Sequence, residues 1–440
     1  MRSPVFWRRS STAAGIYLSA LLGFLGTIVA VRELGLDDFG LFSLVLAAAG
    51  FFQLLADVTV EEAVVKYGFR YLAREDWARL RRIFRIGLEL KLAGGFLAAA
   101  AIALLAPISH LIWARGLTGP LLVAALLPLA QAPHGIAGAA LMVRGRYDLR
   151  AGFLVVSKAL RLAAIAIGGL FGVLGTLIAL VVAQALGTAA ISAAALVALR
   201  RLPLRPAQPL GDDRAPFRRF VVRSSLGSVL SPMRGLLGTL LLGIVTSPRQ
   251  VAYLRVAQVP ESASVILSSP ARMIMLAEQT EDVERGRADL AYRTLRRYVI
   301  AATTLVVVAI PPLALLMPTL LELAYGEGAR AATDAARLFL LVAAIQAVWG
   351  WAKSFPISIG RPELRLLAQG AEIVVLIPAL LVLGGAYGAT GAAGAFLIGS
   401  ITFAGVWTVL LVRLRKQPGP AGSRDPLPEG PLRDRHAEQH

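Results

Sequence analysis

The sequence contains no cysteine among its 440 residues. A disulfide framework, a thiolate metal site and a cysteine nucleophile are therefore excluded. Charged residues are also few, at 16% of the chain against about 25% in an average soluble protein. No Gly-x4-Gly-Lys-Ser/Thr segment occurs, so the phosphate-binding loop of an ATP-driven pump is absent. Nothing in the sequence predicts a metal or another cofactor.

Apolar residues are abundant, at 57% of the chain against about 45 to 50% in average proteins. A helix needs about 20 mostly apolar residues to cross a bilayer. Twelve runs meet this length, and they predict an all-α polytopic membrane protein. The predicted spans are 12–31, 39–60, 86–106, 120–143, 152–172, 174–199, 224–245, 251–275, 298–317, 335–357, 367–387 and 389–412.

The formal net charge is +18, which in a polar protein would indicate nucleic acid binding. Here the basic residues gather in short clusters between the apolar runs. Of the 45 basic residues, 35 fall in or beside alternate connecting segments. Because positively charged loops stay in the cytoplasm, this distribution predicts cytoplasmic termini and excludes nucleic acid as the partner. The proline-rich tail 413–440 is predicted to be disordered.

The two halves of the chain resemble each other when shifted by 212 residues. The shift aligns Gly15, Ser19, Gly23, Leu25, Gly26 and Thr27 with Gly227, Ser231, Gly235, Leu237, Gly238 and Thr239. The sequence therefore predicts two six-helix lobes, 1–199 and 224–412, joined by a basic cytoplasmic linker over 200–223. A substrate site is expected near the middle of the bilayer, where such repeats face each other.

Four segments carry a resemblance to a known family: Arg32 to Leu44, Leu55 to Asp57, Val251 to Gln258, and Ala324 to Gly328. In this order and spacing they resemble the polysaccharide and O-antigen flippases of the multidrug/oligosaccharidyl-lipid/polysaccharide (MOP) exporter superfamily. The resemblance implies a multi-pass protein of a bacterial inner membrane. It also implies alternating access of two lobes, which move an oligosaccharide on a polyprenyl pyrophosphate carrier to the outer leaflet. Membrane lipids, glycosyltransferases and a polysaccharide polymerase are the implied partners.

Charged residues inside a span are costly and usually face a cavity or a partner. Arg234 stands near the centre of the seventh span, where the first half has Leu22. The shared scaffold does not require arginine there, so we expect Arg234 to bind the diphosphate. A structural ion pair is the alternative.

Further candidates for substrate binding are Lys158 and Arg161, which share one helix face, and Arg255, which aligns with Ser43 when the two halves are superimposed in sequence. Gln184 and Gln346 are candidates for hydrogen bonds to sugar hydroxyls. Snorkelling towards the interface is the alternative for Lys158 and the preferred interpretation of Lys91.

The candidates for proton or Na⁺ coupling are Asp57, Glu61, Glu372 and His134, with ion pairing or core packing as the alternative.

Two rival functions would depend on other residues. A membrane-embedded glycosyltransferase could use the acidic pair Asp37-Asp38, but the outer loops leave little room for a catalytic domain. A drug/cation antiporter of the same superfamily would favour acidic cavity residues, whereas the charges deep in these spans are mostly basic.

Overall fold

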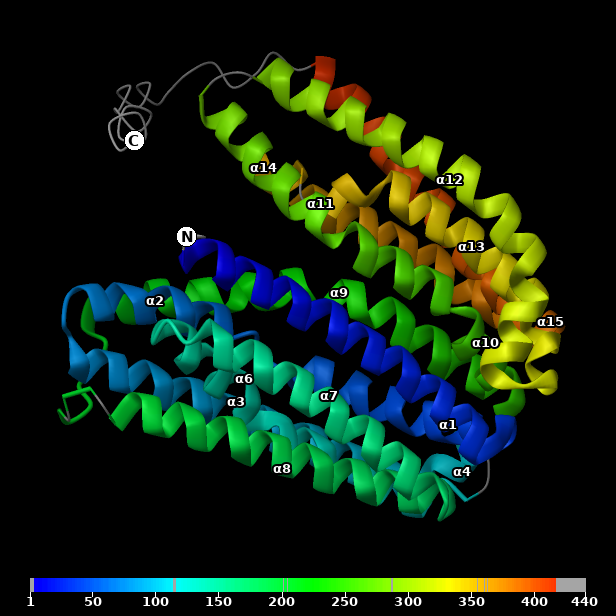
Figure 1. Ribbon diagram of the computed structural model, residues 1–440, viewed down its shortest axis with the longest axis horizontal. Helices are drawn as coiled ribbons and strands as arrows, with labels where there is room; N and C mark the ends of the chain where they lie inside the picture. The colour runs from blue at the N-terminus through cyan, green and yellow to red at the C-terminus, as the bar shows by residue number, and fades with distance from the viewer. Residues whose placement is uncertain are drawn as a thin grey trace.

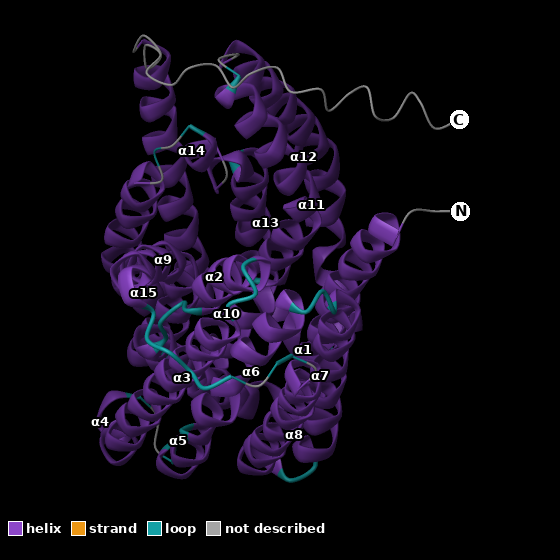
Figure 2. Ribbon diagram, turned by 90° about the vertical axis from the view of Figure 1, so that its left-hand side faces the viewer, coloured by secondary structure: helices purple, strands orange, loops and turns teal. Residues whose placement is uncertain are grey.

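The computed structural model describes residues 4–113, 116–200, 202–203, 205–285, 288–353, 355–359, 361 and 363–416, and most of them are helical. Figure 2 shows only helices and loops there. The elements are α1 (Pro4–Ala56), α2 (Glu61–Ala73), α3 (Trp77–Leu105), η1 (Ala106–Ile108), α4 (Ser109–Ile112), α5 (Thr118–Ala124), α6 (Leu126–Val143), α7 (Tyr147–Gly169), α8 (Gly172–Arg200), η2 (Gly211–Asp213), α9 (Arg214–Val245), α10 (Pro248–Ala257), α11 (Val259–Glu284), α12 (Ala288–Tyr325), η3 (Glu327–Ala332), α13 (Thr333–Val348), η4 (Gly350–Lys353), α14 (Phe355–Ser358) and α15 (Glu363–Lys416).

Eight helices of the described residues are long and apolar enough to cross a membrane. Two of them overlap two predicted spans each: Tyr17–Ala56 covers most of 12–31 and 39–60, and Glu363–Leu414 contains 367–387 and 389–412. Within these long helices the chain bends at Gly35, with φ 73° and ψ 171°, and at Gly388, with φ 59° and ψ −135°. Both conformations favour glycine because it has no Cβ. The predicted span 251–275 is divided between α10 and α11, and the count of twelve passes remains a prediction.

The helices gather in two groups. Helix α1 packs against α3, α7 and α8 of the first group, and α13 packs against α11, α12 and α15 of the second. Helix α9 contacts α1 and α2 on one side and α15 on the other. The groups meet where α1 contacts α10, and they diverge towards the end that holds α2 and α14 (Figure 1). We refer to them as the N-terminal and C-terminal lobes.

The segment 200–223, predicted as a linker, is partly helical because α9 begins at Arg214. Its buried residue Phe217 packs edge-on against Tyr67 of α2, with 5.3 Å between the ring centroids. Asp213 accepts hydrogen bonds from Arg70 at 2.9 Å and Tyr71 at 2.8 Å. Burial, with the bond to Asp213, raises the pKa of Tyr71. At the other end of the chain α15 continues to Lys416, and the rest of the predicted tail, 417–440, lies outside the described residues.

The lobes touch closely at the end opposite α2. Gly40 of α1 lies against the carbonyl group of Pro248, and a Cβ at Gly40 would collide with that carbonyl. Arg32 of α1 donates to the carbonyl oxygens of Leu323 at 2.5 Å and Ala324 at 2.9 Å, in the last turn of α12. A cation is well placed there because helix carbonyls carry partial negative charge at the C-terminal end. These contacts hold the two lobes together at this end.

Candidate functional site

Each lobe contains a cavity lined by charged and amide side chains. The C-terminal lobe holds the larger one, about 360 Å³, between α9, α10, α11, α13 and α15. The N-terminal lobe holds one of about 190 Å³ between α1, α2, α3 and α6. Most charged residues that the sequence marks as candidates line one of these cavities or lie near it.

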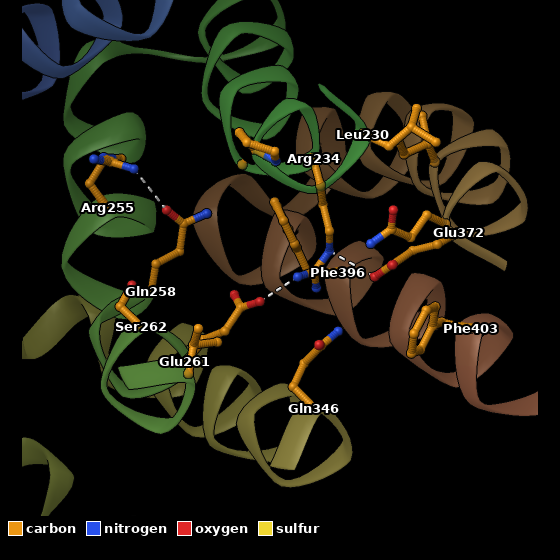
Figure 3. Close-up of a pocket in the computed structure, with 15 residues that line it drawn as sticks. Leu230, Arg234, Arg255, Gln258, Glu261, Ser262, Gln346, Glu372, Phe396 and Phe403 are labelled. Carbon is orange, nitrogen blue, oxygen red and sulfur yellow. Dashed lines mark hydrogen bonds and ion pairs between the residues drawn. The ribbon is translucent and has the colours of Figure 1, made fainter. Parts of the chain in front are cut away.

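Arg234 is the central charged residue of the larger cavity (Figure 3). Its guanidinium forms an ion pair with Glu261 and a second one with Glu372, where Nε lies 2.8 Å from Oε1. It also donates to Ser400 Oγ at 3.1 Å, and its guanidinium carbon lies 4.8 Å from the ring centroid of Phe396. The side chain is 12% exposed. The ion pairs that the alternative interpretation expects are therefore present, and a role of Arg234 in binding the diphosphate stays a prediction.

The sequence interpretation missed Glu261. This residue stands in the first turn of α11, just after the chain leaves α10 at Gln258. The rule that a charge inside a span marks a cavity or a partner applies to Glu261 as well as to Arg234. An acidic residue within the predicted span 251–275 was thus the available signal. The identity of its partner was not available, because 27 residues separate Glu261 from Arg234.

Lys91 occupies a similar place in the smaller cavity. Its ammonium lies 2.5 Å from Asp57 Oδ1 and 2.6 Å from Glu61 Oε1, and the residue is 8% exposed. The expectation that Lys91 snorkels is wrong, because the carboxylates of Asp57, just after α1, and of Glu61, at the start of α2, hold it inside the lobe. His134 of α6 lines the same cavity, and its Nδ1 is buried with no hydrogen-bond partner among the described residues.

Three of the basic candidate residues have no ion pair in the described part of the chain: Lys158 and Arg161 on α7, and Arg255 on α10. Arg255 lines the larger cavity and donates to Gln258 Oε1 at 3.2 Å (Figure 3). Arg161 lies within electrostatic range of both Lys158 and Arg255. The helices that carry these cations, α7 in one lobe and α10 in the other, both pack against α1.

The two glutamines expected at the substrate lie in different surroundings. Gln346 of α13 is 7% exposed and points into the larger cavity (Figure 3). Gln184 of α8 instead donates to Thr188 of its own helix at 3.1 Å, and it does not line either of the two cavities. Only Gln346 therefore has a place beside the charged residues.

The fold is shared with membrane transporters of known structure. Lipid II flippase MurJ in an inward closed conformation superposes with a TM-score of 0.69 at 13% identity, over 92% of this chain and 88% of that one. An inward-facing MATE family transporter of the MOP superfamily gives 0.69 at 16% identity, over 90% and 94%. A mutant of the Vibrio cholerae MATE transporter VcmN gives 0.60 at 16% identity, over 94% and 96%.

No curated protein sequence matches the chain. A family model described as polysaccharide biosynthesis protein matches residues 9–277, more than half of the sequence. This match agrees with the resemblance carried by the segments around Arg32 and Val251. The chain belongs to the polysaccharide biosynthesis protein family, and it has the fold of the MOP-superfamily transporters.

Proposed function

We propose that this protein flips a lipid-linked oligosaccharide, carried on a polyprenyl diphosphate, across a bacterial inner membrane by alternating access. The family match and the shared fold with a lipid flippase and with MATE transporters support a membrane flippase or transporter. The distribution of basic residues favours cytoplasmic termini. In this orientation the lobes diverge towards the cytoplasm, because that end holds α2 and the basic start of α9 (Figure 1). The substrate would then enter from the inner leaflet.

In our proposal the diphosphate binds between the lobes, at Arg161 and Arg255, with Lys158 beside them. The observation that carries this assignment is that Arg161 on α7 and Arg255 on α10, two helices that both pack against α1, have no carboxylate partner among the described residues. Like charges repel, and an anion placed between them would relieve that repulsion. Guanidinium groups bind phosphate oxygens in a fixed bidentate geometry. Arg234 is less suited to this role because Glu261 and Glu372 already compensate its charge.

We assign ion coupling to the smaller cavity, at Asp57, Glu61 and His134. Lys91 holds both carboxylates there, so a proton or Na⁺ that enters must compete with its ammonium group. Glu372 is less suited to such exchange because its partner Arg234 stays protonated under all physiological conditions.

The test is a flipping assay in proteoliposomes with a fluorescent polyprenyl-diphosphoryl hexose. Arg161→Ala and Arg255→Ala should each slow translocation by about tenfold or more, the loss expected when a charge-assisted contact is removed. Arg85→Ala is the matched control, because Arg85 is an exposed arginine paired with Glu89 on the surface of α3. Undiminished flipping by both Arg161→Ala and Arg255→Ala, at normal protein levels, would contradict the proposal.

A drug/cation antiporter is the second candidate, favoured by the similarity to MATE transporters. It would need acidic residues free to bind a cation, yet Arg234 occupies the carboxylates of the larger cavity. Uptake of ethidium by the same proteoliposomes, without flipping of the diphosphate lipid, would favour this function.

A glycosyltransferase function has less support, because Asp37 lies 3.8 Å from Arg249 where the lobes meet. Retained flipping by Asp37→Asn and Asp38→Asn would exclude a catalytic need for them.

A further inference from the structure

The larger cavity has space for a ligand beside the ion pairs of Arg234. Its volume of about 360 Å³ falls within the range of about 300 to 1,000 Å³ that small-molecule sites occupy. The cavity of the N-terminal lobe, at about 190 Å³, falls below that range. Of these two cavities, the C-terminal one therefore has the volume typical of a small-molecule site.

The charges around this cavity balance. Arg234 lies between Glu261 and Glu372, and Arg255 adds a second positive charge at the wall. Two arginines and two glutamates leave no net charge to attract a free ion. A cavity of this kind favours a ligand that is polar and neutral.

Hydrogen-bonding capacity in the cavity is left unused. Gln369 is 5% exposed, and its Oε1 is buried without a partner among the described residues. Buried polar atoms are nearly always paired in folded proteins, so such an atom in a cavity wall points to a missing partner. Gln346 and Ser262 line the same cavity. Amides both donate and accept, as sugar hydroxyls do.

The position of Arg255 connects this cavity to the proposed diphosphate site. Arg255 belongs to the wall of the cavity, and its helix α10 packs against α1, as does α7, which carries Arg161. A diphosphate held by the two arginines would place its next group at the cavity. In a lipid-linked oligosaccharide that group is the first sugar. Phe396 and Phe403 complete the wall with apolar surface (Figure 3).

We infer that the cavity of the C-terminal lobe is a saccharide subsite, which receives the sugar attached directly to the diphosphate, with Gln346 and Gln369 as its hydrogen-bonding residues. The inference rests on the proposed function. It adds a discriminating contact, because amides that hydrogen-bond a sugar reject ligands that leave them unpaired. The arginines bind the diphosphate, which all such lipids share, and the glutamines distinguish one sugar from another by hydrogen bonding.

The test measures binding to the purified full-length protein in detergent by titration calorimetry. The probes are farnesyl diphosphate and a panel of farnesyl-diphosphoryl hexoses with glucose, galactose or N-acetylglucosamine. At least one hexose should bind about tenfold more tightly than farnesyl diphosphate, as expected from one or two added hydrogen bonds. Gln346→Leu and Gln369→Leu should each remove most of this gain and leave the affinity for farnesyl diphosphate within about twofold. Gln184→Leu is the matched control and should keep both affinities.

The outcomes separate the subsite from the proposed function. Equal affinity for farnesyl diphosphate and for every hexose would overturn the saccharide subsite and leave the diphosphate site standing. Glutamine variants that weaken both kinds of probe equally, with unchanged melting temperatures, would also overturn it. If wild-type protein binds none of the probes, the diphosphate site fails, and the subsite fails with it. Loss of all binding in Arg255→Ala alone would support the link between the two sites.

Discussion

Lys91 Nζ lies 2.5 Å from Asp57 Oδ1 inside the N-terminal lobe. A second carboxylate, that of Glu61, lies 2.6 Å from the same ammonium group. Lys91 comes from α3, Asp57 follows the end of α1, and Glu61 begins α2. The ammonium group of Lys91 therefore stabilises the segment that connects α1 to α2.

Lys91→Met should destabilise the N-terminal lobe, because it leaves two neighbouring carboxylates without their shared cation. Asp57 and Glu61 are 38% and 30% exposed, so solvent screens part of the effect. We expect a loss of about 1 to 3 kcal/mol, below the about 3 to 5 kcal/mol of a fully buried pair. Thermal melting in detergent measures the change. Arg85→Ala, which breaks an exposed pair with Glu89, should leave the melting temperature nearly unchanged.

Arg234→Gln should unfold at a clearly lower temperature, whereas Arg255→Gln should bind substrate poorly and melt normally. Arg234 and its partners are between 6% and 15% exposed, so its loss leaves Glu261 and Glu372 buried without a counter-charge, at about 3 to 5 kcal/mol. Arg255 has no carboxylate to leave behind. Adding Glu372→Gln to Arg234→Gln should recover part of the stability. A normal melting temperature for Arg234→Gln would show that the pair contributes little.

Gly35→Ala should destabilise the protein by about 1 to 3 kcal/mol, because its φ of 73° and ψ of 171° lie in a region that is almost restricted to glycine. The loss follows from backbone strain, since a Cβ at this position meets nothing within 4 Å. Gly23→Ala is the matched control on the same helix, where the backbone is helical and a Cβ also has open space. It should be neutral or slightly stabilising. Equal melting temperatures for the two variants would argue against strain at Gly35.

Joining the lobes where they touch should stop transport. Gly328 lies close to Leu36, with 2.9 Å between its virtual Cβ and Leu36 Cδ1. The chain contains no cysteine, so Leu36→Cys and Gly328→Cys create one specific target for a short bis-maleimide linker. We expect cross-linked protein to lose flipping and each single variant to retain it after the same treatment. Continued flipping by fully cross-linked protein would contradict alternating access through this contact.

Arg32→Ala should loosen the lobe contact that the cross-link would fix. Its guanidinium donates to the carbonyl oxygens of Leu323 and Ala324 across the lobes. Without these bonds the end that is closed in this structure should open more often. Spin labels on cysteines introduced at positions 36 and 328 would report a larger share of long distances in pulsed dipolar spectra. An unchanged distance distribution would show that the neighbouring packing alone keeps the lobes together.

Several features followed from the sequence because they depend on local composition. Apolar runs of the length of a bilayer predict helices in any arrangement, and the family segments predict the shared fold. The sequence identified Arg234 as a candidate because charged residues are rare inside an apolar span. Its surroundings were not predictable, because Glu261 and Glu372 come from other helices. Lys91 was misjudged for the same reason: near the end of a span, snorkelling and pairing look alike until the neighbouring helices are placed.

The sequence by itself determined the helical class, the repeat and the surplus of positive charge, since these depend on hydrophobic length and residue type. The tertiary structure alone decided which charges are compensated. Arg234 and Arg255 are alike in the sequence, each an arginine in an apolar run. Packing surrounds Arg234 with two carboxylates, whereas Arg255 contacts Gln258 and has no carboxylate partner among the described residues. Electrostatic energy depends on distance through space, and only the fold sets those distances.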